Sequence, residues 1–227
     1  MNNQVKTNET MASNDKIKLD IVSDVMCPWC IVGYKRLEAA INELGLQDKI
    51  EIEWQPFELN PDMPQQGENL SEHIMRKYGS SREDSAKARD DLTTLGAEYG
   101  FTFDYFDGMN IVNTRDAHIL LDFAHEQGLQ HQLKQRLFTA FFTERKDVSD
   151  RAVLLAEAQA VGLEPESAAV ALEDAERRSQ VVDKEVFWQQ QGISGVPTVI
   201  FNRTSAITGA HAQSTYKQVL QELLEQG

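Results

Sequence analysis

Residues 17–30 read IKLDIVSDVMCPWC, and this stretch decides the fold. In Ile17–Val22, apolar and polar side chains alternate and several are β-branched, which predicts a strand buried on at least one face. From Pro28 onward, apolar residues recur at steps of three and four, which predicts an amphipathic helix. The cysteines Cys27 and Cys30 are therefore expected where a strand passes into a helix.

A Cys-x-x-Cys pair at the start of a helix has surroundings suited to redox chemistry. Unpaired N–H groups and the helix dipole favour an anion there, so Cys27 is expected to be the more acidic and more exposed thiol. Cys30, one turn into the helix, is expected to face inward and to resolve a mixed disulfide on Cys27. Pro28 suits the first helical position because the N–H that it lacks would have no partner. The pattern predicts thiol–disulfide exchange.

Composition narrows the classes of protein. A chain of 227 residues suits one large domain or a domain with an insertion, and 41% hydrophobic with 26% charged residues is ordinary for a globular protein. The net charge of −14, from 36 acidic and 22 basic side chains, argues against nucleic acid and anionic membranes as partners. With only two cysteines, any disulfide within the chain joins Cys27 to Cys30.

No stretch has the pattern of a targeting or membrane segment. Residues 1–16 are polar and are expected to form a disordered tail, without the apolar run of about 7 to 15 residues that a secretory signal needs. No run approaches the ~18 apolar residues of a membrane span. We therefore expect a cytoplasmic protein with no membrane partner. In that compartment an isolated Cys-x-x-Cys indicates catalysis or metal binding rather than a structural disulfide.

Two other roles of the cysteine pair compete with redox catalysis. A zinc site needs four ligands, but the chain has no second cysteine pair and its five histidines show no His-x-x-x-His spacing, so no metal is expected. The pair could also be buried and inert. Pro28 and the passage from strand to helix argue against that alternative.

The rest of the chain predicts a sheet-forming unit interrupted by helices. Further strands are expected at residues 49–54, 198–201 and 206–208. Helices are expected at residues 82–99, 113–127, 133–143, 151–161, 175–191 and 213–224. We therefore predict an α/β domain formed by residues 17–60 and 175–227, and an all-helical insertion over residues 61–174.

The order of these motifs resembles the thioredoxin superfamily, and more closely its DsbA branch with an all-helical insertion. The motifs CPWC (27–30) and GVPT (195–198) carry this resemblance, which covers nearly the whole chain after the tail. It implies a thioredoxin fold, in which helices flank a central mixed sheet. A signal-less FrnE-like subgroup is similar at SDVMCPWC (23–30), at WQPFELNP (54–61), and at Asn113-Thr114 followed by Ala117-His118.

The resemblance also implies an activity and a set of partners. It implies a protein disulfide oxidoreductase or isomerase with no cofactor beyond its own disulfide, acting on protein or peptide thiols and disulfides, or on glutathione as co-substrate. Pro197 is implied to follow a cis peptide bond beside the cysteines. Val196 would then offer backbone groups to an extended substrate. Pro28 and Trp29 are candidates for substrate contact.

Other residues each have two interpretations. Asp24 is a candidate for tuning the thiol pKa, which its charge would raise, and the alternative is a loop or capping acid. His118 is expected to be a packing or surface histidine rather than a base. Three phenylalanines are expected in the core of the insertion, with a substrate groove as the alternative for some of them: Phe138, Phe141 and Phe142.

Two rival functions remain open. Hydroxychromene-carboxylate isomerases and kappa-class glutathione transferases resemble this chain in their insertion, but they typically have Ser at the position of Cys27, so the intact pair argues against them. A peptide-binding chaperone would use the groove without redox turnover. The sequence leaves open the substrate, the oligomeric state and whether the exchange oxidises, reduces or isomerises.

Overall fold

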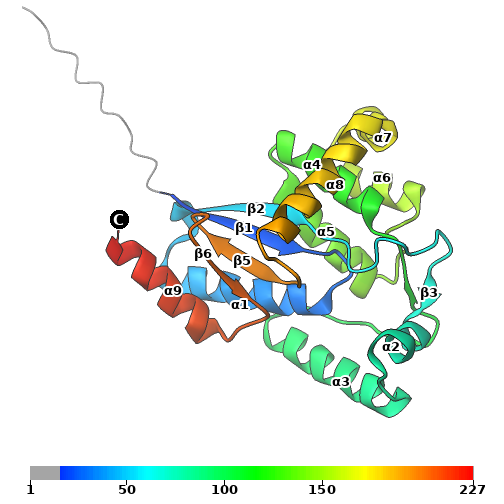
Figure 1. Ribbon diagram of the computed structural model, residues 1–227, viewed down its shortest axis with the longest axis horizontal. Coiled ribbons are helices and arrows are strands. Elements are labelled where there is room, and N and C mark those ends of the chain that lie inside the picture. The colour runs from blue at the N-terminus through cyan, green and yellow to red at the C-terminus, as the bar shows by residue number, and fades with distance from the viewer. Residues whose placement is uncertain (1–15, 227) are drawn as a thin grey trace, which may run out of the picture.

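The computed structural model describes residues 16–226, so that the tail predicted over residues 1–16 lies outside the described residues except for Lys16. Figure 1 shows a four-stranded sheet with helices on both of its faces. The strand order is β2-β1-β5-β6. The strands are β1 (Ile17–Ser23), β2 (Ile50–Pro56), β5 (Thr198–Phe201) and β6 (Ser205–Thr208).

The sheet is mixed, as predicted. Strand β1 is central and pairs parallel with β2, so that Ile21 lies opposite Trp54. It pairs antiparallel with β5, which places Val199 opposite Ile21 on the other side. A parallel pair needs a crossover, and the helix α1 (Pro28–Leu44) supplies it. The thiols stand at the end of the central strand, where the chain enters this helix.

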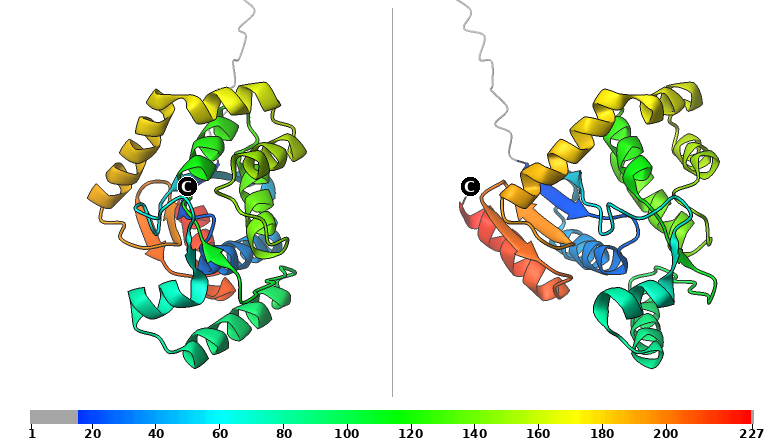
Figure 2. Two further views of the ribbon diagram at one scale, coloured as in Figure 1. Left: turned by 90° about the vertical axis from the view of Figure 1, so that its right-hand side faces the viewer. Right: turned by 45° about the vertical axis from the view of Figure 1, so that its right-hand side comes forward.

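The helices α1 and α9 (Gln213–Gln226) pack against each other on one face of the sheet, and α8 (Ala175–Gln190) crosses the other side (Figure 1). A 3₁₀ turn, η1 (Gln47–Lys49), leads into β2. The insertion contributes α2 (Leu70–Tyr78), α3 (Arg82–Glu98), α4 (Arg115–Glu126), α5 (Gln130–Phe142), α6 (Arg151–Ala160) and α7 (Pro165–Glu173). Figure 2 shows α2 and α3 as one group and α4 to α7 as another.

The insertion is helical, as predicted, with one exception that the sequence pattern did not indicate. Two short strands, β3 (Glu68–Asn69) and β4 (Asn110–Ile111), pair antiparallel. Two residues are too few to show an alternation of apolar and polar side chains. Gly67, before β3, allows this close approach, because a Cβ there would lie 2.4 Å from the carbonyl oxygen of Ile111. Helix α2 was also not predicted.

A buried glutamine joins the insertion to the sheet. β2 is an edge strand, and the side chain of Gln130 on α5 pairs with its backbone at Trp54. The Trp54 N–H donates to Oε1 at 2.8 Å, and Nε2 donates to the Trp54 carbonyl at 2.9 Å. The indole of Trp54 packs edge-on against Phe138 in the same core. At Trp54, the backbone N–H and carbonyl on the open edge of β2 are therefore hydrogen-bonded to a side chain instead of to a neighbouring strand.

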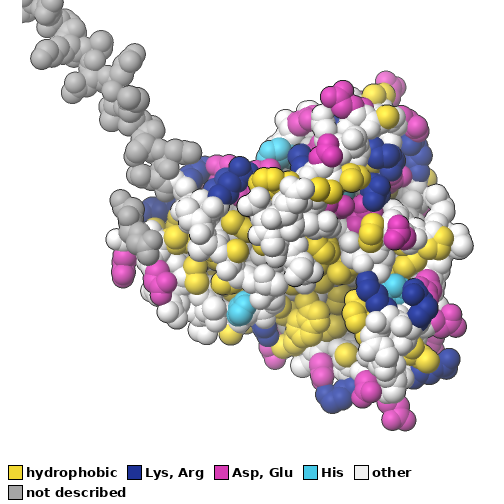
Figure 3. Space-filling model, in the orientation of Figure 1, with side chains coloured by type: hydrophobic (Ala, Val, Ile, Leu, Met, Phe, Trp, Pro, Cys, Tyr) yellow, Lys and Arg dark blue, Asp and Glu magenta, His cyan; other side chains and the backbone are white. Residues whose placement is uncertain are grey.

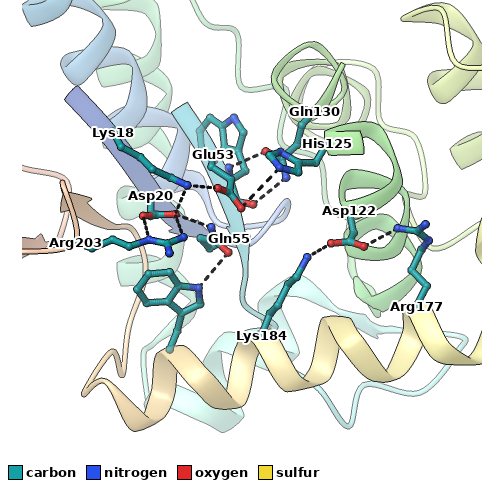
Figure 4. Close-up of polar contacts among 12 residues, drawn as sticks. Lys18, Asp20, Glu53, Gln55, Asp122, His125, Gln130, Arg177, Lys184 and Arg203 are labelled. Carbon is teal, nitrogen blue, oxygen red and sulfur yellow. Dashed lines mark hydrogen bonds and ion pairs between the residues drawn. The ribbon is translucent and has the colours of Figure 1, made fainter. Parts of the chain in front are cut away.

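Polar contacts hold α8 to the sheet and to the insertion, and Figure 4 shows both sets. Gln55 on β2 donates to the carboxylate of Asp20 on β1 at 2.7 Å and accepts from the indole N–H of Trp188 on α8. Farther along α8, Lys184 pairs with Asp122 on α4. Helix α8 is thus attached near its middle and near its C-terminal end, and it leads directly into the loop before β5.

We expect Asp20→Ala to lower the free energy of unfolding by about 1 to 3 kcal/mol. Asp20 is fully buried, and its loss leaves the amide of Gln55 and the guanidinium of Arg203 without their acceptor. Urea denaturation measures the change. Asp91→Ala is the control, because Asp91 forms an exposed pair with Lys87 and should cost less than about 0.5 kcal/mol. Equal effects of the two variants would contradict a structural role for the buried carboxylate.

Candidate active site

The two cysteines begin helix α1. Cys27 is the N-cap residue and Pro28 occupies the first helical position, as the sequence predicted. Both cysteines are free and lie 3.3 Å apart, so no disulfide joins them. Cys30 is one turn into the helix and its backbone N–H donates to the carbonyl of Cys27 at 3.1 Å. The motif is therefore compact, with both sulfurs at one end of the helix.

Cys27 is the more exposed of the two thiols, as predicted, but it is buried and not an exposed residue. Its exposed fraction is 5%, against 1% for Cys30. The hydrogen bond between the two thiols raises the pKa of Cys27, and burial and the charge of Asp24 add to this. Burial opposes ionisation of Cys30 too, but the hydrogen bond from Cys27 outweighs it, together with the Ser23 hydroxyl and a nearby cation, and its pKa is lowered. The order of acidity is the reverse of the prediction.

That cation is Lys134, which the sequence analysis did not single out. It lies on α5 and is fully buried, with Nζ donating to the carbonyl oxygen of Ser23 at 3.3 Å. Nζ also lies 5.2 Å from the ring centre of Trp54 and 5.0 Å from that of Phe138. Burial lowers the pKa of Lys134 to about 8, and the nearby thiols and carboxylate oppose this. Its position four residues before Phe138, on the same helix face, is the one sequence signal of its burial.

Asp24 is buried beside the thiols and does not cap α1. Its Oδ2 accepts the backbone N–H of Leu59 at 2.8 Å, and Nε2 of His118 lies 3.5 Å from its Oδ1. Burial raises the pKa of Asp24, but His118, the Leu59 N–H and Lys134 outweigh burial and lower it. His118 itself is buried, in keeping with a packing role. The site thus has a carboxylate whose charge disfavours ionisation of Cys27.

The loop before β5 lies against Cys27. The carbonyl oxygen of Val196 is 3.9 Å from Sγ of Cys27, and the Val196–Pro197 peptide bond is cis. Pro197 is buried over α1, where Gly33 leaves room for it: a Cβ on Gly33 would lie 3.1 Å from Cγ of Pro197. The carbonyl of Pro197 accepts the N–H of Gly209 at 2.8 Å. These contacts fix the loop backbone beside Sγ of Cys27.

A cavity of about 390 Å³ adjoins Cys27. Figure 3 shows the apolar surface around it as a hollow between α2 and α3 and the rest of the molecule. Pro28, Val196 and Trp29 border it, and Trp29 is 45% exposed. Its walls include Leu70, Ile74, Leu92, Met109, Phe141 and Phe142. All three phenylalanines lie in the buried core, as predicted, and Phe141 and Phe142 also line the groove that the sequence offered as an alternative.

A pair of buried carboxyl groups lies near Asp24. Glu58 follows β2 and Glu185 comes from α8, and the two side chains are close enough for the charge of Glu58 to act on Glu185. Arg115 on α4 donates to Glu58. Burial and the charge of Glu58 raise the pKa of Glu185 to about 8, with Arg115 acting in the opposite direction. Glu185 therefore keeps its proton at neutral pH.

The part of the chain covered by residues 16–226 shows no group of three or more His, Cys, Asp or Glu side chains arranged to hold a metal ion. No helix in these residues has both the length and the apolar character needed to cross a membrane. The functional groups at the site are therefore the two thiols, Asp24, Lys134 and the groups that line the cavity.

Residues 18–221 match the family model described as the DSBA-like thioredoxin domain. The chain belongs to this family. The match runs from β1 into α9 and so includes both sheet-forming segments and the insertion between them. It confirms the predicted thioredoxin fold with a helical insertion, and it supports a redox enzyme.

Three known proteins are similar over nearly their whole length. YwbO of Bacillus subtilis (strain 168), described as uncharacterized, is 28% identical over 218 residues, which are 91% of this chain and 96% of YwbO. The crystal structure of a probable DsbA oxidoreductase from Streptomyces coelicolor has a TM-score of 0.87 and 28% identity, with 93% of this chain and 91% of that chain covered. The cytosolic disulfide reductase DsbM from Pseudomonas aeruginosa shares the fold, with a TM-score of 0.63, 19% identity, and 92% and 100% coverage.

We expect Lys134→Met to raise the pKa of Cys30, because the variant removes the nearby cation. Methionine fills the space of the apolar stem, so the core should stay packed. The pH dependence of thiolate absorbance in the ultraviolet measures the shift. Lys49→Met, on the exposed 3₁₀ turn, is the control and should leave the midpoint in place. Identical titrations of the two variants would show that Lys134 does not act on the thiols.

We expect Glu185→Gln to change how stability depends on pH. The pKa of Glu185 rises from an ordinary value of 4.5 to about 8 on folding, so its contribution to stability is full below 4.5 and is lost as the pH rises through 8. Glutamine stays neutral throughout. The free energy of unfolding of the variant minus that of the wild type should therefore increase between about pH 5 and 8. Above that range the difference should stay constant. Urea denaturation across this range measures it, and parallel curves would contradict the protonated state of Glu185.

Proposed function

We propose that this chain is a thiol–disulfide oxidoreductase in which Cys27 is the nucleophile and Cys30 the resolving thiol. The observation that supports this most directly is the position of two free cysteines at the start of α1, where the carbonyl of Val196 lies near Cys27 and both residues border an apolar cavity. The reaction needs no cofactor beyond the disulfide that the two cysteines form.

The exchange takes place in two steps. The thiolate of Cys27 attacks one sulfur of a substrate disulfide, a mixed disulfide forms on Cys27, and the other half of the substrate leaves as a thiolate that takes up a proton. The thiolate of Cys30 then attacks Sγ of Cys27 and releases the second half. Two electrons have passed to the substrate, and a Cys27–Cys30 disulfide remains. The same steps in reverse oxidise a substrate dithiol.

The surroundings of the two thiols act on these roles in different directions. The raised pKa of Cys27 makes its thiolate a stronger nucleophile, because nucleophilicity increases with basicity, but it also lowers the fraction of Cys27 that is ionised at neutral pH. The lowered pKa of Cys30 makes it the better leaving group when an external thiol attacks Cys27 in the oxidised protein. Lys134 would stabilise the departing thiolate. Asp24 would increase the difference between the pKa values of Cys27 and Cys30, since its charge raises the pKa of Cys27.

Substrate contacts follow from the same arrangement. Val196, before the cis bond to Pro197, would offer its backbone to an extended peptide, which gives affinity without strong dependence on sequence. Pro28 and Trp29 would contact the substrate at the border of the cavity. Proteins and peptides with thiols or disulfides are the proposed substrates. Glutathione is a candidate co-substrate, since the fold resembles that of DsbM, for which a structure with GSH is known.

The cytoplasmic location and the FrnE-like subgroup stay predictions of the sequence. The isomerase or transferase alternative is disfavoured because this chain has a cysteine at position 27, where those enzymes typically have Ser. A chaperone without redox turnover would work without that thiol. Equal protection of an aggregating client by Cys27→Ser and by wild type would favour the chaperone.

We expect Cys30→Ser to accumulate mixed disulfides in cell extract, because the variant can attack a substrate but cannot resolve the product. Gel electrophoresis without reductant should show partners linked to Cys27, and reductant should release them. The double variant Cys27→Ser/Cys30→Ser is the control and should capture none. An extract in which Cys30→Ser captures no partner and no glutathione would contradict the proposed function.

A further inference from the structure

Arg89 is a charged side chain of the cavity that has no partner of opposite charge. It lies on α3 and is half-buried, and its Nη1 donates to the hydroxyl of Ser85 at 2.8 Å and lies 3.5 Å from that of Ser71. Within residues 16–226 it forms no ion pair with a carboxylate, although Lys87 on the same helix pairs with Asp91. The remaining donors of its guanidinium are therefore available to a ligand.

The hydroxyl of Tyr105 is a second available polar group at the same cavity. It is buried and has no hydrogen-bond partner among the described residues. Burial and the charge of Cys27 raise the pKa of Tyr105, and the charge of Arg89 lowers it, so the hydroxyl is within electrostatic reach of both groups. A buried hydroxyl without a partner is unfavourable unless a ligand or water completes it.

Two other ionisable side chains of the lining have partners. The carboxylate of Asp84 accepts the hydroxyl of Ser81 at 2.7 Å at the start of α3. Nδ1 of His73 lies 2.7 Å from Oε2 of Glu68. Most of the remaining wall is apolar. Within the described residues, the cavity thus combines a cation without an ion-pair partner and the buried hydroxyl of Tyr105 with apolar walls and, at its border, a thiol.

We propose that the cavity binds a low-molecular-weight disulfide that has an apolar body and an anionic group. The anion lies on Arg89 and the hydroxyl of Tyr105, the body contacts the apolar walls, and the sulfur lies at Cys27. A guanidinium suits this task because it binds a carboxylate through two parallel hydrogen bonds. The volume of about 390 Å³ is within the range of small-ligand sites. This inference rests on the proposed function and names its substrate class.

Two aromatic disulfides of similar size test the role of the charge. Dithio-bis-nitrobenzoate has a carboxylate on each ring, and dithiodipyridine has none. In each case the Cys27 thiolate displaces one aryl thiolate and Cys30 displaces the other. The probe gains two electrons, the protein gains the Cys27–Cys30 disulfide, and the thiol protons go to the solvent or to the departing thiolate. The absorbance of the released thiol or thione gives the rate with either probe.

The measured quantity is the ratio of the second-order rate constants for the anionic and the neutral probe. We expect Arg89→Met to lower this ratio about tenfold, since it removes one charged hydrogen-bonding partner. Arg89→Lys should retain part of the ratio, and Tyr105→Phe should lower it less. Arg82→Met is the matched control, because it removes an exposed charge from the same helix and should leave the ratio unchanged.

Each other outcome has a distinct meaning. An unchanged ratio in Arg89→Met, or an equal loss with both probes, would overturn the assignment of this site. A reduced rate with a disulfide-linked apolar peptide, together with an unchanged ratio, would assign the cavity to peptides and also overturn it. If neither probe produced a Cys27–Cys30 disulfide in the wild type, the proposed function itself would be contradicted.

Discussion

The ammonium group of Lys134 has no access to water, and the structure around it compensates its charge. The Ser23 carbonyl accepts a hydrogen bond from it, two aromatic rings face it, and Asp24 supplies negative charge. A buried charge without such partners would cost several kcal/mol. Because Lys134 comes from the insertion and its polar partners come from the sheet domain, this compensation fixes the insertion relative to the cysteines.

The same requirement extends to the carboxyl groups nearby. Lys134 and Arg115 supply two positive charges, and Asp24 and Glu58 supply two negative ones. Glu185 adds no charge while burial keeps it protonated. The charges therefore balance around neutral pH, and ionisation of a thiol disturbs that balance. The acidity of Cys30 accordingly depends on Lys134 from α5 as well as on the helix that bears it.

Local signals predicted much of the fold, and contacts distant in sequence explain what they missed. The passage from strand to helix at Cys27 has its evidence within a few residues, and so do the strands and most helices. Lys134 has its partner Ser23 at a sequence separation of 111 residues, and a lysine ordinarily indicates a surface position. The cavity beside Cys27 is lined in part by α2, whose short and polar sequence was not predicted as a helix. The predicted order of thiol acidities left out the hydrogen bond between the two thiols and the charge of Lys134.

The pairing of β1 has a consequence for biosynthesis. One neighbour of this strand, β2, follows soon after it, but the other, β5, is made near the end of the chain, where Phe201 pairs with Leu19. A ribosome therefore completes the whole insertion before the central strand can acquire its second partner. During that interval the Cys-x-x-Cys segment lacks the loop that will lie beside it. Its thiols then react with cellular reductants and oxidants without the surroundings that the folded site provides.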